Sequence, residues 1–174
     1  MVYVFLADGF EDMEAIVPYD LMKRVGIDVV TVGIGGKTVK SAHGLSVIAD
    51  LFENEVDFEK AEAFVLPGGW PGAKNLKNSE TVNNAIKFAM DNDIVIGAIC
   101  ASPGHVLSGT GALFGKRYTC FPGFEVNEGE YTAKDLETDG KLITANGPQS
   151  AVKFGVAIIE ALGAETEEIE AFIQ

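Results

Sequence analysis

Short, fully apolar segments alternate with helical patterns along this chain, and this alternation limits its fold more than any other feature. Residues 2–6, 63–66 and 94–99 are apolar throughout. Runs of this length suit strands that are buried on both faces of a sheet. Strands that alternate with helices predict a parallel sheet with helices on both of its faces. The predicted fold class is therefore α/β, with a mostly parallel central sheet.

Helical patterns fill the segments between these strands. Met13, Ile16 and Leu21 recur at helical spacing, but Pro18 interrupts the pattern, so this helix is kinked there or begins later. Ser79 is a typical N-cap and predicts that a second helix begins just after it. The other predicted elements are strands over 27–32 and 141–144, a hairpin of strands over 38–40 and 45–49, a short helix through Val106 and Leu107, irregular strands and loops over 112–140, and a largely buried helix over 149–162.

Length and charge restrict the organisation and the partners of the protein. A chain of 174 residues predicts one domain, 1–174. A formal net charge of −13 repels phosphate backbones and anionic lipids, which argues against nucleic acid and membrane partners. No apolar stretch approaches the roughly 20 residues of a membrane span, and no basic leader precedes the first strand. Two cysteines are too few for a disulfide scaffold, so we expect a cytoplasmic protein with reduced thiols.

One of the two cysteines lies where an active site is expected. Functional clefts of open α/β sheets lie outside the carboxyl ends of the strands, and Cys100 directly follows the strand over 94–99. Its small neighbours are typical of a nucleophile elbow, where a sharp, strained turn presents the reactive side chain. Pro103 suits the first turn of a following helix, whose positive end would lower the thiol pKa and favour the thiolate. From the residues alone, a buried structural cysteine stays an alternative.

A glycine-rich segment, Gly68-Gly69-Trp70-Pro71-Gly72, reaches the same edge after the strand over 63–66. One interpretation is an oxyanion hole made by the backbone amides of Gly69 and Ala101. A second is a phosphate loop, but the segment lacks the ending of a P-loop and the spacing of a dinucleotide fingerprint. A third is an ordinary glycine turn.

Three carboxylates crowd the start of the first predicted helix, at the same edge of the sheet. A carboxyl group beside a thiolate has a raised pKa and can donate a proton or a hydrogen bond, which is the role we consider for Glu14. Glu11 and Asp12 also fit the positive end of the helix. Spacing alone therefore does not choose among the three.

The histidines complete neither a catalytic triad nor a metal site. His105 lies about 140° around a helix from Cys100, so it is not expected to face the sulfur directly. His43 falls in the predicted hairpin and is expected to be a surface or packing residue. No group of residues has the spacing of metal ligands, and neither a metal nor another cofactor is expected.

Four stretches, taken together, resemble the ThiJ/PfpI superfamily and, within it, the DJ-one branch, which has a class I glutamine amidotransferase-like fold. They occur in order and span most of the chain. They are Gly9-Phe10-Glu11-Asp12-Met13-Glu14-Ala15-Ile16-Val17-Pro18, Leu66-Pro67-Gly68-Gly69, Ala98-Ile99-Cys100-Ala101-Ser102-Pro103 and Asn146-Gly147-Pro148. The resemblance implies a single ThiJ/PfpI-like domain, a three-layer flavodoxin-like sandwich and a homodimer.

The same resemblance also implies a site and a set of activities. It places the reactive cysteine of the family on Cys100, its partner carboxylate on Glu14, and backbone donors at Gly69 and Ala101. Family members are described as glyoxalases or deglycases acting on methylglyoxal and its adducts, as chaperones, or as oxidative-stress sensors. Their cysteine is readily oxidised to the sulfinic acid. The implied partners are small aldehydes or glycated molecules, and no cofactor is implied.

The sequence departs from the family pattern at two positions. The protease-like branch has a histidine directly after the nucleophile, but Ala101 stands there, which argues against a peptidase. Animal members have a histidine just before the proline that matches Pro122, and here that residue is Phe121. These departures place more weight on the partner carboxylate. The secondary candidates near the site are Cys120, Glu125 and His105.

Three functions stay open at this point. In the first, Cys100 attacks the aldehyde carbon of an α-oxoaldehyde, and Glu14 moves the proton that converts the adduct to an α-hydroxy acid. In the second, the protein is an oxidative-stress sensor or redox-regulated chaperone, and oxidation of Cys100 is itself the function. In the third, it is a dimeric interaction protein whose Cys100 has an ordinary thiol pKa of about 8.5.

Overall fold

The computed structural model describes residues 1–167, 169 and 171 and contains a central seven-stranded sheet. Neighbouring strands are parallel except at one edge, where β10 pairs antiparallel with β11. In spatial order the strands are β10 (Leu136–Asp139), β11 (Leu142–Ala145), β7 (Val95–Ile99), β6 (Ala63–Leu66), β1 (Val2–Ala7), β2 (Val29–Ile34) and β5 (Leu51–Phe52).

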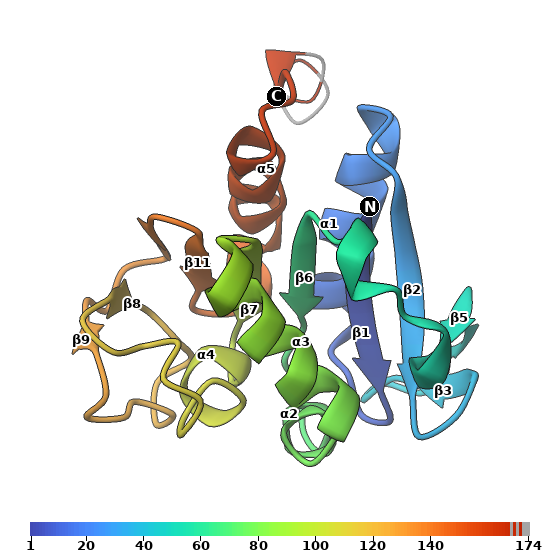
Figure 1. The fold of residues 1–174 in the computed structure, drawn as a ribbon, viewed down its shortest axis with the longest axis horizontal. Coiled ribbons are helices and arrows are strands. Elements are labelled where there is room, and N and C mark those ends of the chain that lie inside the picture. The colour runs from blue at the N-terminus through green and yellow to red at the C-terminus, as the bar shows by residue number, and fades with distance from the viewer. Residues whose placement is uncertain (168, 170, 172–174) are drawn as a thin grey trace.

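Helices cover both faces of this sheet (Figure 1). Tyr3 and Phe5 of β1 pack into one core cluster with side chains of α2 and α3, while Val2, Val4 and Leu6 pack with α1 and α5 on the other face. This alternation is that of a strand buried on both sides. The predicted three-layer, flavodoxin-like α/β sandwich is confirmed. The helices are α1 (Asp12–Arg24), α2 (Gly72–Lys77), α3 (Glu80–Asn92), α4 (Ser102–His105) and α5 (Ala151–Ala161).

Several predicted elements have the expected boundaries. The strand over 63–66 is β6, and the hydroxyl oxygen of Ser79 accepts a hydrogen bond from the Val82 amide at the start of α3. Pro18 lies inside α1, which begins at Asp12 and continues past it. Its ring fits there because Gly155 of α5 faces it, and a Cβ at Gly155 would lie 3.1 Å from the Pro18 Cα.

Other elements differ from the prediction. The second strand begins two residues later than expected, because the Ile27 amide still bonds to the Met22 carbonyl at the end of α1. The final helix begins with a 3₁₀ turn at Pro148–Ser150, and α2 and β5 were not predicted. The hairpin consists of β3 (Thr38–Lys40) and β4 (Ser46–Ile48), and residues 112–140 contain β8 (Arg117–Tyr118), β9 (Glu130–Tyr131) and β10.

The element that follows Cys100 is much shorter than predicted. Helix α4 has only four residues, and Val106 and Leu107 lie beyond its end, fully buried in the core. The strands β1, β6, β7 and β11 are parallel, so the loops that follow them all begin at the same edge of the sheet. Among the described residues, no helix combines the length and the apolar character needed to cross a membrane.

Candidate active site

Cys100 directly follows β7 and has a left-handed backbone conformation, with φ at +63°. A residue other than glycine costs about 1–3 kcal/mol in such a conformation, and this kind of strain concentrates at functional sites. Hydrogen bonds fix the strained residue on both sides. Its amide donates to the Ala145 carbonyl at 2.9 Å, and its carbonyl accepts from the Phe121 amide at 2.8 Å. The strained turn expected at Cys100 is therefore present, and its side chain is half-buried.

Glu14 is fully buried although it lies in the first turn of α1. Its Oε2 atom accepts a hydrogen bond from the Gly68 amide at 2.8 Å. Its carboxyl group also lies beside the thiol of Cys100, and each group shifts the pKa of the other. The Glu11 side chain instead caps the helix and accepts from the Glu14 amide at 2.9 Å. Of the carboxylates that spacing could not separate, Glu14 is the one in contact with the cysteine.

Gly68 allows Cys100 and Glu14 to come together. A Cβ at this position would lie 2.6 Å from the Cβ of Cys100 and 2.6 Å from Oε2 of Glu14, closer than real Cβ atoms approach other groups. The backbone amides of Gly69 and Ala101 lie beside the Cys100 sulfur and act to lower the pKa of its thiol. The two amides considered for an oxyanion hole therefore converge on the sulfur in this state of the protein.

Burial controls the protonation of this pair. It raises the pKa of Glu14 to about 7, although hydrogen bonds from Cys100 and Gly68 favour the charged form. Burial, followed by the negative charge of Glu14, raises the pKa of the Cys100 thiol to about 12. The expectation of a lowered thiol pKa is wrong for this state, because burial disfavours the thiolate more than the neighbouring amides of Gly69 and Ala101 favour it. Burial thus disfavours the charged form of both groups, and Glu14, which has the lower pKa, is the base of the pair.

The second carboxyl oxygen of Glu14 has unused hydrogen-bonding capacity. Oε1 is buried and lacks a hydrogen-bond partner with good geometry among the described residues. A buried oxygen in this condition costs about 1–3 kcal/mol. A group attached to Cys100 that offered a hydrogen bond to Oε1 would remove this cost.

Residues 1–161 match the DJ-1/PfpI family. The chain belongs to this family. It is 34% identical to Protein DJ-1 homolog B of Arabidopsis thaliana over 91% of its length, but it spans only 37% of that longer relative. The crystal structure of Drosophila melanogaster DJ-1beta is also similar, with a TM-score of 0.90 and 33% identity over 97% of this chain and 93% of that chain.

Two similar DJ-1/PfpI proteins carry enzyme names. One is the glutathione-independent glyoxalase DJR-1.2 of Caenorhabditis elegans, 29% identical over 87% of this chain and 82% of that protein. The other is a deglycase of Pyrococcus abyssi, 31% identical over 84% of this chain and 90% of that protein. The relatives of this chain therefore include one protein named as a glyoxalase and one named as a deglycase.

The secondary candidates lie around the site but have other contacts in this DJ-1/PfpI protein. His105 packs its ring against Trp70, and its pKa is lowered by burial and by nearby Lys77 and Lys74. Cys120 is fully buried and is not part of a disulfide. Burial raises the pKa of the Cys120 thiol to about 12, as it does for Cys100, but Cys120 has no exposed surface through which a substrate could reach its sulfur.

Glu125 is exposed and accepts two hydrogen bonds from the Gly123 amide, both at 3.0 Å. These bonds hold the pKa of its carboxyl group below the usual value, so it stays ionised at neutral pH. Such a group is a poor proton donor. The structure therefore leaves Glu14 as the carboxyl group in contact with the sulfur.

Sequence reasoning missed two supports of the site. The sequence shows Gly68 as part of a glycine-rich segment. Its role between the Cys100 and Glu14 side chains depends on a contact between segments that are far apart in the sequence, so it could not be predicted. Ser102 donates a hydrogen bond of 2.6 Å from its Oγ to the Pro67 carbonyl, which ties α4 to the loop after β6. A small polar residue next to a nucleophile elbow was the available signal for this contact.

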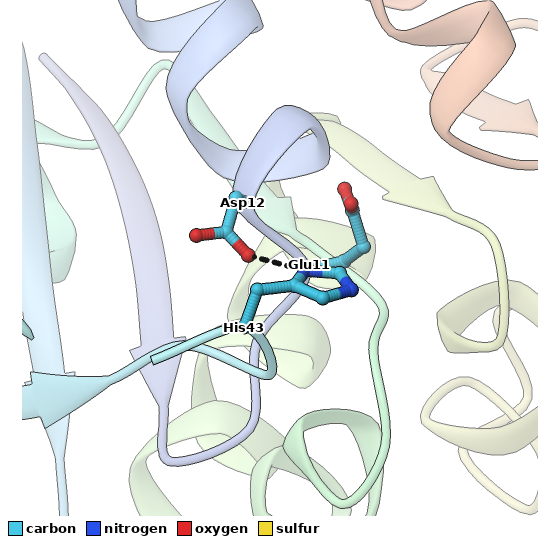
Figure 2. Close-up of side chains that lie close together, drawn as sticks. All are labelled: Glu11, Asp12 and His43. Carbon is cyan, nitrogen blue, oxygen red and sulfur yellow. Dashed lines mark hydrogen bonds and ion pairs between the residues drawn. The ribbon is translucent and has the colours of Figure 1, made fainter. Parts of the chain in front are cut away.

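Glu11, Asp12 and His43 gather at the start of α1 (Figure 2), with ligand atoms within 4.8 Å of one another. Sequence spacing did not reveal this group because His43 comes from the distant hairpin. Each member has a structural partner: Asp12 Oδ2 pairs with His43 Nδ1 at 2.8 Å, and Glu11 caps α1. These hydrogen bonds therefore serve to join the hairpin to α1 and to cap that helix.

Proposed function

We propose that this protein is a cysteine-dependent, cofactor-free glyoxalase or deglycase that converts methylglyoxal-type α-oxoaldehydes to α-hydroxy acids. The observation that carries the proposal is the contact between the strained Cys100 and the buried Glu14, with two backbone amides directed at the sulfur. The enzyme names of the nematode and archaeal relatives support the same reaction class. A peptidase is not proposed, because no histidine follows the nucleophile at Ala101.

The first step forms a carbon–sulfur bond. The Glu14 carboxylate accepts the thiol proton of Cys100 while the sulfur attacks the aldehyde carbon of R–CO–CHO. The carbonyl π electrons move to oxygen, which takes the proton held by Glu14 to give the hemithioacetal R–CO–CH(OH)–S and restores the Glu14 carboxylate. The Gly69 and Ala101 amides beside the sulfur are the donors that would stabilise this developing charge.

The later steps move a proton between adjacent carbons without an external oxidant. Glu14 removes the proton from the former aldehyde carbon, which gives an enediol, and a proton returns to the neighbouring carbon. The product is the thioester R–CH(OH)–CO–S–Cys100. Water then cleaves the carbon–sulfur bond, which releases R–CH(OH)–COOH and restores the thiol. The aldehyde carbon is oxidised and the ketone carbon is reduced. The net reaction is therefore the conversion of R–CO–CHO and one water to R–CH(OH)–COOH.

The test is the conversion of methylglyoxal to lactate by the fully reduced protein. We expect Cys100→Ser to abolish turnover and Glu14→Gln to lower it about 100-fold or more, the range of general acid–base catalysis. Cys120→Ala is the matched control and should keep its turnover, because this buried thiol has no part in the mechanism. Full turnover by the Cys100→Ser variant would overturn the proposal.

A redox role for Cys100 is the second candidate, and the two thiols differ in a way that favours it. Cys100 is half-buried whereas Cys120 is fully buried. Oε1 of Glu14 can also form a hydrogen bond with an oxygen atom that is added to the sulfur. In this role the protein is an oxidative-stress sensor or a redox-regulated chaperone. Mild peroxide should then add two oxygen atoms to Cys100 and none to Cys120 in peptide mass spectra. Oxidation of Cys120 alone would contradict this role.

We also propose that the protein forms a homodimer through α1 and the β3–β4 hairpin. Exposed large apolar side chains gather on these elements: Met13, Ile16, Leu45 and Ile48. The hairpin is joined to the start of α1 by the bond from the Ala42 amide to the Phe10 carbonyl, at 2.8 Å. Gathered apolar side chains of this kind mark interaction surfaces. The free cysteines favour a reducing compartment, for which we propose the cytoplasm.

A further inference from the structure

Three rings form a cluster beside Cys100 that the proposed chemistry does not use. Trp70 and His105 have ring centroids 5.1 Å apart in an edge-to-face arrangement. Phe124 lies 5.8 Å from Trp70 and 6.4 Å from His105. We call Trp70, His105 and Phe124 the aromatic cluster.

Each member of the aromatic cluster comes from a segment that also positions the sulfur. Trp70 directly follows Gly69 and lies two residues after Gly68, where a Cβ would lie only 2.6 Å from the Cβ of Cys100. His105 ends α4, which begins two residues after Cys100. Consecutive Cα atoms are only about 3.8 Å apart, so the Trp70 backbone lies next to the reacting atom.

The third ring is fixed to the same place by a backbone contact. A Cβ at Gly104 of α4 would lie only 1.7 Å from the Phe124 carbonyl oxygen, so this loop rests directly on the helix. The Phe121 amide of the same loop bonds to the Cys100 carbonyl. The loop that carries Phe124 is therefore anchored to both ends of the turn that presents the cysteine.

The aromatic cluster keeps an open apolar surface. Trp70 is 54% exposed despite its two ring contacts, on a protein with a net charge of −13. Burial and the nearby Lys77 and Lys74 lower the pKa of His105, which keeps that ring neutral at neutral pH. Two cavities of about 450 and 590 Å³ are lined by residues other than Cys100 and Glu14, so neither surrounds the sulfur.

We propose that the aromatic cluster is a binding subsite for the R group of R–CO–CHO and selects aryl or bulky apolar α-oxoaldehydes over methylglyoxal. This inference rests on the proposed function and assigns its substrate class. An aromatic ring packs well against an exposed indole, whereas the methyl group of methylglyoxal covers little of it. With phenylglyoxal the reaction is the same in atoms and electrons: the aldehyde and one water give mandelate.

The kinetic test compares kcat/KM for phenylglyoxal with kcat/KM for methylglyoxal. We expect Trp70→Ala to lower this ratio about 3- to 10-fold, the size of one aromatic contact. Trp70→Phe should restore most of the ratio, since it keeps a ring at this position. Phe114→Ala is the control, because Phe114 is 84% exposed but lines the 590 Å³ cavity instead of the site. An unchanged ratio in Trp70→Ala would overturn the proposal.

A binding test separates this inference from the reaction itself. Trp70 is the sole tryptophan of the chain, so tryptophan emission reports directly on the subsite. In the Cys100→Ser variant, mandelate should change the emission saturably at concentrations about 3- to 10-fold lower than lactate. Equal responses to the two acids would overturn the subsite. If neither aldehyde is turned over by the unmodified protein, the proposed function fails, and this titration still decides whether the subsite exists.

Discussion

At Gly68, the absence of a single side-chain carbon decides whether the cysteine and the glutamate can touch. The nearest atoms to a Cβ there belong to Cys100 and Glu14, and neither can retreat because one is strained backbone and the other is fully buried. Gly68→Ala should therefore separate the two side chains and lower turnover about 100-fold, as displacements of about 1 Å do in active sites. Gly36→Ala is the control, since a Cβ there meets only an ordinary contact at 3.6 Å. Equal activity of the two variants would contradict this account of Gly68.

The protonation of Glu14 should also be visible in the stability of the protein. Its pKa is about 7 in the folded protein, above its ordinary value of 4.5. Between these values the folded state holds a proton that the unfolded state has lost. The free energy of unfolding should therefore fall as pH rises from about 4.5 to about 7, by up to about 3 kcal/mol.

Urea denaturation across this pH range measures the effect. Glu14→Gln has no such proton to lose, so its unfolding free energy should change less, and the variant should be more stable than the unmodified protein at pH 8. Parallel pH profiles for the two proteins would show that Glu14 ionises normally in the folded state.

The sequence predicted some residues of the site better than others. Cys100 was predicted because a fully apolar strand, small neighbours and a proline describe a nucleophile elbow. Glu14 was not separable from Glu11 and Asp12 without a family resemblance, because all three suit a helix start. Their separation depends on which side chain turns inward toward Gly68, and that contact joins segments 54 residues apart. The raised thiol pKa was missed because burial outweighs the effect of the neighbouring backbone amides.

At the scale of elements, two loops are held together by one buried hydrogen bond. Ser102 begins α4, and its hydroxyl donates to the Pro67 carbonyl at the start of the loop after β6. Ser102→Ala leaves this buried carbonyl without its donor, so we expect a loss of about 1–3 kcal/mol in unfolding free energy and a lower turnover. Ser108→Ala removes a less buried bond to Glu128 and should cost less on both measures. A larger loss in Ser108→Ala would refute the importance of the Ser102 bond.

Elements with strong periodic patterns were predicted well, and elements fixed by distant contacts were not. Strand β6 and helix α3 carry their own signals, an apolar run and an N-cap. The edge strand β5 has only two residues, too few to form a pattern, and the edge strand β10 includes Glu137 and Asp139, so it lacks a fully apolar pattern. Helix α2 is short and follows a segment rich in glycine and proline. Such a segment predicts a turn, so the helix was not expected.

At the scale of the whole molecule, the proposed dimer makes a prediction about one exposed residue. Ile48 is 76% exposed on the β3–β4 hairpin. Ile48→Lys would place a charge into the proposed apolar interface, so the sedimentation coefficient should shift from that of a dimer toward that of a monomer. Phe114→Lys is the control on a different face and should leave the assembly unchanged. A monomer in the unmodified protein, or equal dissociation of both variants, would exclude this interface.

The central claim is that Cys100 and Glu14 convert an α-oxoaldehyde to a hydroxy acid by moving a proton between adjacent carbons. The most direct measurement is proton NMR of methylglyoxal conversion in D₂O by the fully reduced protein. The account predicts lactate that carries deuterium at C2, because the proton passes through Glu14, which exchanges with solvent. It also predicts no lactate from Cys100→Ser. Absence of lactate from the unmodified protein, or equal lactate from Cys100→Ser, would contradict the claim.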